Sequence, residues 1–282
     1  MIIDVKNIVK HYKTHKAVND VSFTVKEGEI FGFLGPNGAG KSTMIKMLTA
    51  RLTSTSGSIL VSGFDPRKER DKLHNIIGVV PEVQNLYERM SARENLNLFA
   101  KLYRTDPTKV DKLLKRFELS DRADDKIKNF SFGMKQRVLL ARCLLSDPKI
   151  IFMDEPTKGL DPHTASYIRD IIKEENNKGT TIFLTTHYME EAEVLSNRVA
   201  IIDNGKILAL DTPKNLKQNR SEIKVFLKIA QNSKKFETLS LNNIEDKETL
   251  KTWLDAHEVV SIESNEESLE DIFLRVTGRS FK

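Results

Sequence analysis

The chain has 282 residues, of which 30% are charged and 39% hydrophobic, and it carries a formal net charge of +5. This length accommodates one large domain or two smaller ones, and the composition excludes a disordered or fibrous protein. No apolar run is long enough to span a bilayer, and residues 1–5 lack the features of a signal peptide. We therefore expect a cytosolic chain that does not cross a membrane by itself.

The positive charge and the few metal-ligating residues narrow the possible partners. A modest excess of Lys and Arg could favour nucleic acid or an anionic membrane surface. The lysines, however, are interspersed with Glu and Asp, which is typical of a solvated surface, so no nucleic-acid partner is expected. Cys143 lies in an apolar helical run and is predicted to be a reduced core residue. The histidines show no metal-ligand spacing, so no zinc site is implied.

The first 146 residues are predicted to change from strands to helices. Residues 21–25 alternate as in a strand, and residues 29–34 form an apolar strand that runs into a Gly-rich loop and a helix. Residues 84–146 have helical periodicity: a capping box at Ser91–Glu94 begins one helix, Asp106–Pro107 begins a second, and a third starts near Ser131.

Strand patterns return after this helical stretch. Residues 149–153 and 180–186 read as buried strands, with a helix over residues 162–177 between them. Strand, helix and strand at this spacing predict a parallel βαβ unit. Asn204–Gly205 lies between two short apolar runs and is a hairpin signal. The pattern predicts an α/β core into which the helical segment of about 84–146 is inserted.

The last part of the chain has a pattern of its own. Residues 225–229 and 259–262 are predicted strands, and residues 250–254 and 269–276 are predicted helices. Gly278 follows the last helix, as at a C-cap. We therefore predict a main domain over residues 1–220 and a small accessory α/β module over residues 221–282.

A phosphate-binding loop lies between the strand at residues 29–34 and the following helix. The segment matches G-x-x-x-x-G-K-[ST] in the strand–loop–helix context that the motif needs. Backbone N–H groups of such a loop curl around phosphate oxygens, the lysine reaches the β- and γ-phosphates, and the first hydroxyl residue binds Mg²⁺. A structureless Gly-rich turn is the alternative. The predicted nucleotide-binding residues are Gly35, Pro36, Asn37, Gly38, Ala39, Gly40, Lys41, Ser42 and Thr43.

Acidic and histidine side chains follow the later strands. Asp154 and Glu155 end the strand at residues 149–153, and His187 follows the strand at 180–186. Ligands of parallel sheets bind at these ends, so Asp154 is predicted to hold Mg²⁺ and Glu155 to orient a water molecule for attack on the γ-phosphate. His187 is predicted to bond to that phosphate or to Glu155. The alternatives are a capping Asp-Glu pair and a structural histidine.

Three segments taken together are more specific than any one of them. Residues 130–137 (FSFGMKQR), 154–161 (DEPTKGLD) and 186–187 (TH) occur in this order after the phosphate loop. Over roughly residues 2–220 the chain resembles the ATP-binding cassette of ABC transporters. The resemblance implies an α/β P-loop NTPase fold of ABC type, with a mixed sheet core, an inserted helical subdomain and a small C-terminal α/β extension. It also implies ATP hydrolysis with Mg²⁺.

The resemblance assigns roles to further residues. Tyr12 matches the aromatic that stacks on adenine, and Glu82 falls where the family has a glutamine that contacts Mg²⁺ and the attacking water. Ser131 and Gly133 match the signature motif, and Asp161 ends the loop that crosses the interface between two cassettes. The resemblance implies that a second cassette, here expected to be a second copy of this chain, completes the site. The catalytic residues it implies are Glu155, His187 and Lys41, and the metal ligands are Ser42, Asp154 and Glu82.

Two positions depart from the family pattern. Glu82 replaces the usual glutamine and adds a negative charge near the phosphates. Phe132 stands where the signature usually has glycine, so its ring must point away from the phosphate, and Met134 replaces a common glutamine.

The tail resembles one branch of the family. Residues 268–278 (SLEDIFLRVTG) are similar to the end of sodium- and drug-export cassettes, although an amphipathic closing helix is the alternative interpretation. The branch implies a separate integral membrane permease, gripped by the helical insert, and a peripheral location on the inner face of the cell membrane. Candidate substrates are a drug, a peptide, a lipid-linked compound or sodium. A ribosome-associated or regulatory cytosolic ABC ATPase, a DNA-repair or chromosome-structure ATPase and an importer's ATPase remain alternatives.

Overall fold

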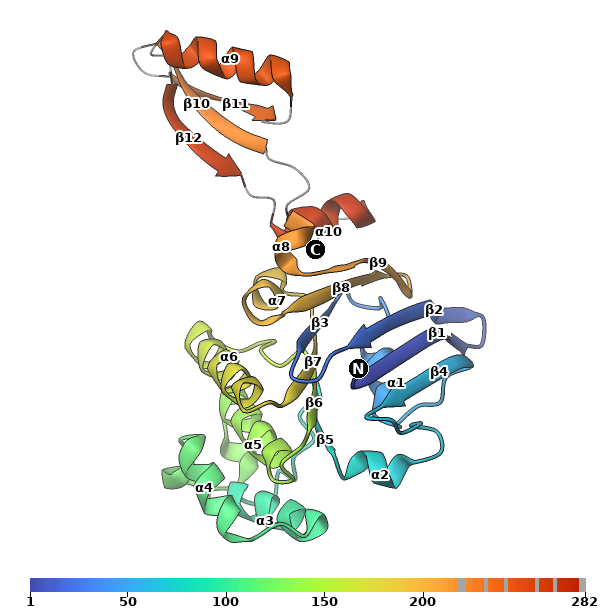
Figure 1. Ribbon diagram of the computed structural model, residues 1–282. Helices are drawn as coiled ribbons and strands as arrows, with labels where there is room; N and C mark the ends of the chain where they lie inside the picture. The colour runs from blue at the N-terminus through green and yellow to red at the C-terminus, as the bar shows by residue number, and fades with distance from the viewer. Residues whose placement is uncertain (218–221, 231–232, 241–242, 257–258, 266–267, 279–282) are drawn as a thin grey trace. The chain divides into compact units, whose positions relative to one another are not determined.

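The computed structural model describes most of the chain, and its elements are labelled in Figure 1. The described residues are 1–217, 222–230, 233–240, 243–256, 259–265 and 268–278. The chain divides into two compact units, residues 1–210 and 211–282. Each unit has its own sheet, so the two are described separately.

A six-stranded sheet forms the centre of the first unit, in the order β5-β6-β7-β3-β8-β9. β3 pairs in parallel with β7 and β8, and β6 pairs in parallel with β5 and β7. Every residue of β3, β6 and β7 is buried, which explains why these strands read as continuous apolar runs rather than alternating ones. The strands are β3 (Ile30–Leu34), β5 (Ile77–Val80), β6 (Ile150–Asp154), β7 (Thr181–Thr186), β8 (Arg198–Asp203) and β9 (Lys206–Asp211).

A second, antiparallel sheet covers one face of the central sheet. Its order is β2-β1-β4, with β1 (Ile3–Tyr12), β2 (His15–Val25) and β4 (Ser56–Val61). Helix α1 (Lys41–Leu48) lies on the same side. Phe23 of β2 joins the two sheets, because its ring centroid is 5.3 Å from that of Phe31 in β3 and 5.9 Å from that of Phe183 in β7.

Helices cover the other face. Figure 1 shows α5 (Phe132–Leu144) and α6 (Pro162–Asn177) against the central sheet, with α3 (Ala92–Tyr103) and α4 (Thr108–Arg116) beyond α5. Ser91 and Glu94 form the expected capping box at the start of α3. Ser131 caps α5 by accepting from the Met134 N–H. Short helices α2 (Arg70–His74) and α7 (Met189–Leu195) and two 3₁₀ turns (Ser120–Arg122 and Ile127–Asn129) complete this unit.

The second unit has a sheet in the order β11-β10-β12 and three helices. Leu239 is buried against Leu250, Trp253 and Val259, which gives this unit a small core. Its elements are α8 (Pro213–Lys217), β10 (Glu222–Ala230), β11 (Ser233–Ser240), α9 (Ile244–Asp255), β12 (Val259–Asn265) and α10 (Leu269–Thr277).

The boundary between the units lies ahead of the position that the sequence suggested. The sequence placed it after residue 220, whereas the contacts divide after Leu210. The reason is α8, which the sequence analysis did not find and which packs against α10 of the second unit. Thr212 caps α8 through its hydroxyl, 3.0 Å from the Asn215 nitrogen.

Candidate active site

The phosphate loop connects β3 to α1, and two of its glycines are required by close backbone contacts. A Cβ on Gly35 would lie 2.2 Å from the Ile202 carbonyl oxygen, and one on Gly40 would lie 2.5 Å from the Ala17 carbonyl oxygen. Gly40 also has a φ of +112°, which L side chains rarely adopt. The loop is therefore held by the neighbouring β8 and β2 in a shape that only glycine permits.

This loop forms the floor of a cavity of about 290 Å³. Tyr12, at the end of β1, contributes to the wall and keeps 44% of its surface exposed. His15 and Ala17 also line the cavity, and the sequence analysis missed them. Their signal was available, since they follow Tyr12 across a tight turn in which Tyr12 pairs with His15. The full lining is Tyr12, His15, Ala17, Pro36, Gly38, Gly40, Lys41, Ser42, Thr43, Glu82 and Glu155.

Three charged or titratable side chains form a chain of contacts at this cavity. Lys41 and Glu155 are both buried, and the Lys41 ammonium lies 3.0 Å from Glu155 Oε1. The same ammonium donates to the Gly35 carbonyl oxygen at 2.6 Å. The other carboxylate oxygen of Glu155 lies 2.7 Å from His187 Nδ1. The structure thus brings together the three residues that the sequence proposed as catalytic, from α1, the end of β6 and the end of β7.

Asp154 lies beside this chain in a polar but buried position. Thr185 of β7 donates its hydroxyl to Asp154 Oδ1 at 2.5 Å, and Ser42 also bonds to the carboxylate. Burial raises the pKa of Asp154, and the negative charges of Glu82 and Glu155 add to this rise, while the bonds from Thr185 and Ser42 oppose it. Three carboxylates and one hydroxyl therefore converge at one end of the sheet.

Glu82 has a partner that the sequence analysis did not find. Its carboxylate lies 2.7 Å from the ammonium of Lys158, and both side chains are about equally exposed. Glu82 follows β5, and Lys158 lies in the turn after β6, where its N–H bonds to the Glu155 carbonyl oxygen at 3.2 Å. Nothing in the local sequence of either loop indicates this pair.

The segment that begins α5 lies outside the cavity lining. Ser131 is exposed at the start of the helix, and a Cβ on Gly133 would come within 3.0 Å of the Thr164 side chain in α6. Asp161 caps α6 by accepting from Thr164 N and Oγ1 at 2.9 and 2.7 Å. The Phe132 ring is 47% exposed and lies toward Gly159. Ser131, Gly133 and Asp161 are therefore near one another and apart from the phosphate loop cavity in a single chain.

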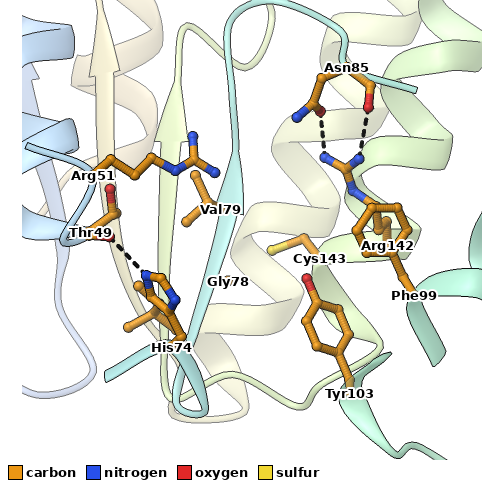
Figure 2. A pocket seen from close by; sticks show the side chains of 11 residues that line it. Thr49, Arg51, His74, Gly78, Val79, Asn85, Phe99, Tyr103, Arg142 and Cys143 are labelled. Carbon is orange, nitrogen blue, oxygen red and sulfur yellow. Dashed lines mark hydrogen bonds between the residues drawn. The ribbon is translucent and has the colours of Figure 1, made fainter. Parts of the chain in front are cut away.

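A second cavity, of about 190 Å³, lies between the end of α1 and the helices (Figure 2). Arg142 of α5 donates to both oxygens of Asn85, at 3.1 and 2.7 Å, and lies over the Phe99 ring. Cys143 is buried as expected, and burial raises the pKa of its thiol to about 12, so the thiol stays protonated. The residues around this cavity are Thr49, Arg51, His74, Ile77, Gly78, Val79, Asn85, Phe99, Tyr103, Arg142 and Cys143.

Comparison with known proteins identifies this arrangement. The ABC transporter family model matches residues 18–158, which carry the phosphate loop, the α5 start and Asp154–Glu155. A fluoroquinolones export ATP-binding protein of Mycobacterium tuberculosis is 39% identical over 282 residues, which cover 99% of this chain and 94% of that protein. This chain belongs to the ABC transporter family.

Two further relatives of this ABC protein are informative. A Nod factor export ATP-binding protein I of Rhizobium meliloti is 36% identical, over 99% of this chain and 89% of that protein. The solved dimeric structure of a post-hydrolysis ATP-binding cassette bound to ADP and Pi superimposes with a TM-score of 0.68 at 29% identity, over 74% of this chain and 98% of that one. The predicted P-loop NTPase fold of ABC type is confirmed, and the chain is an ATP-binding and ATP-hydrolysing subunit.

Two searches of the described residues add limits. No helix in the described segments is both long enough and apolar enough to cross a bilayer. Over the same segments, no group of three or more His, Cys, Asp or Glu side chains is arranged to hold a metal ion by itself.

Proposed function

We propose that this ABC protein is the ATPase subunit of an exporter, in which two copies bind and hydrolyse two molecules of Mg-ATP and drive a separate membrane subunit. The observation that carries the proposal is the Lys41–Glu155–His187 chain of contacts at the wall of the phosphate loop cavity. It places a phosphate-binding cation, a carboxylate base and a hydrogen-bonding imidazole within reach of one γ-phosphate.

Lys41 would serve as the cation that binds the phosphates. Its ammonium is at present held by Glu155 and the Gly35 carbonyl oxygen, so it has to exchange the carboxylate for the β- and γ-phosphate oxygens of ATP. The N–H groups at the start of α1 face the same anions, and the positive end of the helix favours them. Tyr12, on the opposite wall, offers a ring on which the adenine would stack.

The residues around Asp154 fit a magnesium ion. Mg²⁺ prefers carboxylate and hydroxyl oxygens, and Asp154, Ser42 and Glu82 supply them at one place. The raised pKa of Asp154 supports this proposal, because the repulsion among the carboxylates would be relieved by a cation. When bound, Mg²⁺ bridges phosphate oxygens and neutralises charge that develops on them.

Glu155 would act on the attacking water. Once Lys41 has moved to the phosphates, the Glu155 Oε1 atom is released to accept a hydrogen bond from water, while His187 still holds Oε2. His187 thereby keeps the carboxylate oriented and can donate to the γ-phosphate or to the carboxylate, according to its protonation state. A backbone φ of +53° at Glu155 is uncommon for a non-glycine residue and is held by the surrounding loop.

A second copy of this chain would complete the site. Ser131 and Gly133 are exposed at the N-terminal end of α5, where N–H groups and the helix dipole favour an anion, yet they do not line the cavity of their own chain. Two copies related by a twofold axis could place each Ser131 against the γ-phosphate in the other's cavity. The similar solved cassette is a dimer, which supports this arrangement.

The second cavity is where we propose that the membrane subunit docks. Its wall includes the ring of Phe99 and the side chains of Tyr103 and Arg51, and Arg142 closes one end (Figure 2). Export is proposed because the Mycobacterium and Rhizobium relatives are named for export, of fluoroquinolones and Nod factor respectively. The cassette would then lie on the inner face of the cell membrane, with a drug, peptide, lipid-linked compound or sodium as candidate cargo.

A trapped dimer tests the proposal. Glu155→Gln leaves Lys41, Ser42 and Asp154 to bind Mg-ATP but removes the base, so the ATP-bound pair should persist. Gel filtration of this variant with Mg-ATP is expected to show a dimer, and the same protein without nucleotide a monomer. Co-expression with the membrane protein encoded beside this chain is expected to carry the cassette into the membrane fraction. A variant that stays monomeric with bound Mg-ATP would refute the two-copy site.

A further inference from the structure

The ion pair between Glu82 and Lys158 joins two loops that both reach the nucleotide cavity. Glu82 lines the cavity, and its carboxylate is 2.7 Å from the Lys158 ammonium. The pKa of Lys158 is raised, chiefly by its hydrogen bond to Glu82 and further by the charges of Glu82 and Glu155. Lys158 is thus a second cation at this site, in addition to Lys41.

Lys158 balances the extra charge at position 82. Asp154, Glu155 and Glu82 bring three negative charges to one end of the sheet, and the pKa of Asp154 responds to both of the others. Lys41 offsets one charge through Glu155, and Lys158 offsets another through Glu82. An uncompensated Glu82 would repel the triphosphate, whereas a fully paired Glu82 has no free oxygen pair for a metal ion. The pair therefore controls when Glu82 is available.

We propose that Lys158 is a positioning residue for Glu82: it holds the Glu82 carboxylate away from the Ser42–Asp154 pair until a divalent cation competes for it. The proposal rests on the assignment of Glu82 as a metal ligand under the proposed function. The cation and the ammonium compete for the same carboxylate, so binding of Mg²⁺ opens the ion pair and releases Lys158.

Opening the pair would be felt at the start of α5. Gln84, two residues after Glu82, donates to the Phe132 carbonyl oxygen at 2.9 Å. Gly159, next to Lys158, faces the Phe132 ring, since a Cβ there would lie 3.6 Å from Cε1. Glu82, Lys158, Gly159, Phe132 and Gln84 therefore form a closed ring of contacts, and the ion pair is its most exposed link. Metal occupancy is in this way transmitted to the helix end that would meet the second copy.

The experiment compares ATP binding without and with metal. The purified chain is titrated with fluorescent ATP in EDTA and in saturating MgCl₂, and the ratio of the two dissociation constants gives the tightening caused by Mg²⁺. Lys158→Met should weaken ATP binding in EDTA, because a positive charge is lost, but enlarge the tightening by about 2- to 5-fold, the range that exposed ion pairs reach. Lys158→Arg keeps the ion pair and should leave the tightening at the wild-type value.

The same measurements in a Glu82→Gln background separate competition from simple charge. With no carboxylate to release, Lys158→Met should no longer enlarge the tightening, although it still weakens binding in EDTA. An equal enlargement in both backgrounds, or none in either, overturns the proposal. Lys178→Met breaks an ion pair of the same 2.7 Å length with Glu175 and is the matched control, since neither residue lines the nucleotide cavity. A wild-type chain that binds no ATP would instead refute the proposed function.

Discussion

The phosphate loop and the start of α5 carry the two most specific motifs of the chain, but they differ in how their side chains are held. Around the loop, Lys41, Asp154 and Glu155 are buried and each has charged or hydrogen-bonded partners. At the start of α5, Ser131 is exposed, and its printed partner is the N–H of its own helix. One motif is assembled by its own chain, whereas the other faces outward.

This difference teaches which interactions need one chain and which need two. Buried, paired polar groups are oriented before a ligand arrives, so the loop region is prepared to bind ATP in a single chain. An exposed helix N-terminus gains little from a ligand while water competes, and it becomes an effective anion site when a second surface excludes that water. ATP binding should therefore survive changes at Ser131, and ATP hydrolysis should not.

The largest effect is expected where the single-chain part of the site loses its cation. Lys41→Ala removes the ammonium that would bind the β- and γ-phosphates, and it also leaves Glu155 buried without its lysine partner. ATP hydrolysis should fall by at least about 10²- to 10³-fold, as when one preorganised donor is removed from a transition state. Steady-state phosphate release and fluorescent ATP binding measure the two consequences.

Lys46→Ala is the matched control, because Lys46 is an exposed lysine of the same helix. It should hydrolyse ATP at the wild-type rate. A folded Lys41→Ala protein with normal activity would show that the cavity at the phosphate loop is not the ATP site.

A smaller and more selective loss is expected at the exposed motif. Ser131→Arg places a long side chain where a second copy would approach, so hydrolysis should fall about 10²-fold through loss of the helix-end donor. The ATP dissociation constant of the single chain should stay within about 2-fold of wild type, since Ser131 does not line the cavity. Phosphate release and ATP titration are measured on the same sample.

Ser120→Arg, at an exposed position of a 3₁₀ turn, controls for the added charge and bulk. If Ser131→Arg instead weakens ATP binding and hydrolysis in parallel, the division between a one-chain and a two-chain part is wrong.

How much could be predicted from sequence depends on whether the signal is local. The phosphate loop, the capping box at Ser91 and the buried strands were predicted because residue type and spacing within a few positions specify them. Strand β11 was missed since its apolar residues Phe236 and Leu239 are three positions apart and do not alternate. Residues 241–242 and 279–282, within the predicted C-terminal module, lie outside the described residues.

Contacts between distant loops could not be predicted in the same way. Lys158 and Glu82 are 76 positions apart, and Gln136 donates to the Pro156 carbonyl oxygen across 20 positions. Each pair depends on the register of strands β5 and β6 and on the position of α5, which are tertiary facts. The family resemblance indicated which loops matter, but not which side chains within one chain bond to one another.

The smallest expected effect concerns stability without ligand, and it reverses the usual sign for an active-site change. Folding raises the pKa of Asp154, mainly through burial, so the folded chain favours the neutral carboxyl. The resulting stabilisation is fully present below the unfolded pKa and is lost as the pH rises through the folded pKa. At neutral pH an ionised Asp154 therefore destabilises the ligand-free chain.

Asp154→Asn removes that ionisation while its amide oxygen can still accept from Thr185. The free energy of unfolding at neutral pH should rise by roughly 0.5–2 kcal/mol, as for other changes that relieve a functional cost, with a melting temperature higher by a few degrees. The gain should vanish at acidic pH, where Asp154 is itself neutral. Added Mg-ATP should stabilise the variant less than the wild type.

Asp161→Asn is the control with the opposite expectation. Bonds from the Thr164 N–H and hydroxyl lower the pKa of Asp161, so its ionised form is favoured by folding. This stabilisation is present above the unfolded pKa of the carboxyl and is lost as the pH falls through the folded value, so neutralising Asp161 should not raise the melting temperature at neutral pH. Thermal unfolding of both variants across a pH series measures the contrast. A ligand-free Asp154→Asn chain that melts below the wild type at neutral pH would mean that the hydrogen bonds from Thr185 and Ser42 outweigh burial, and that the single-chain part of the site is stable without a cation.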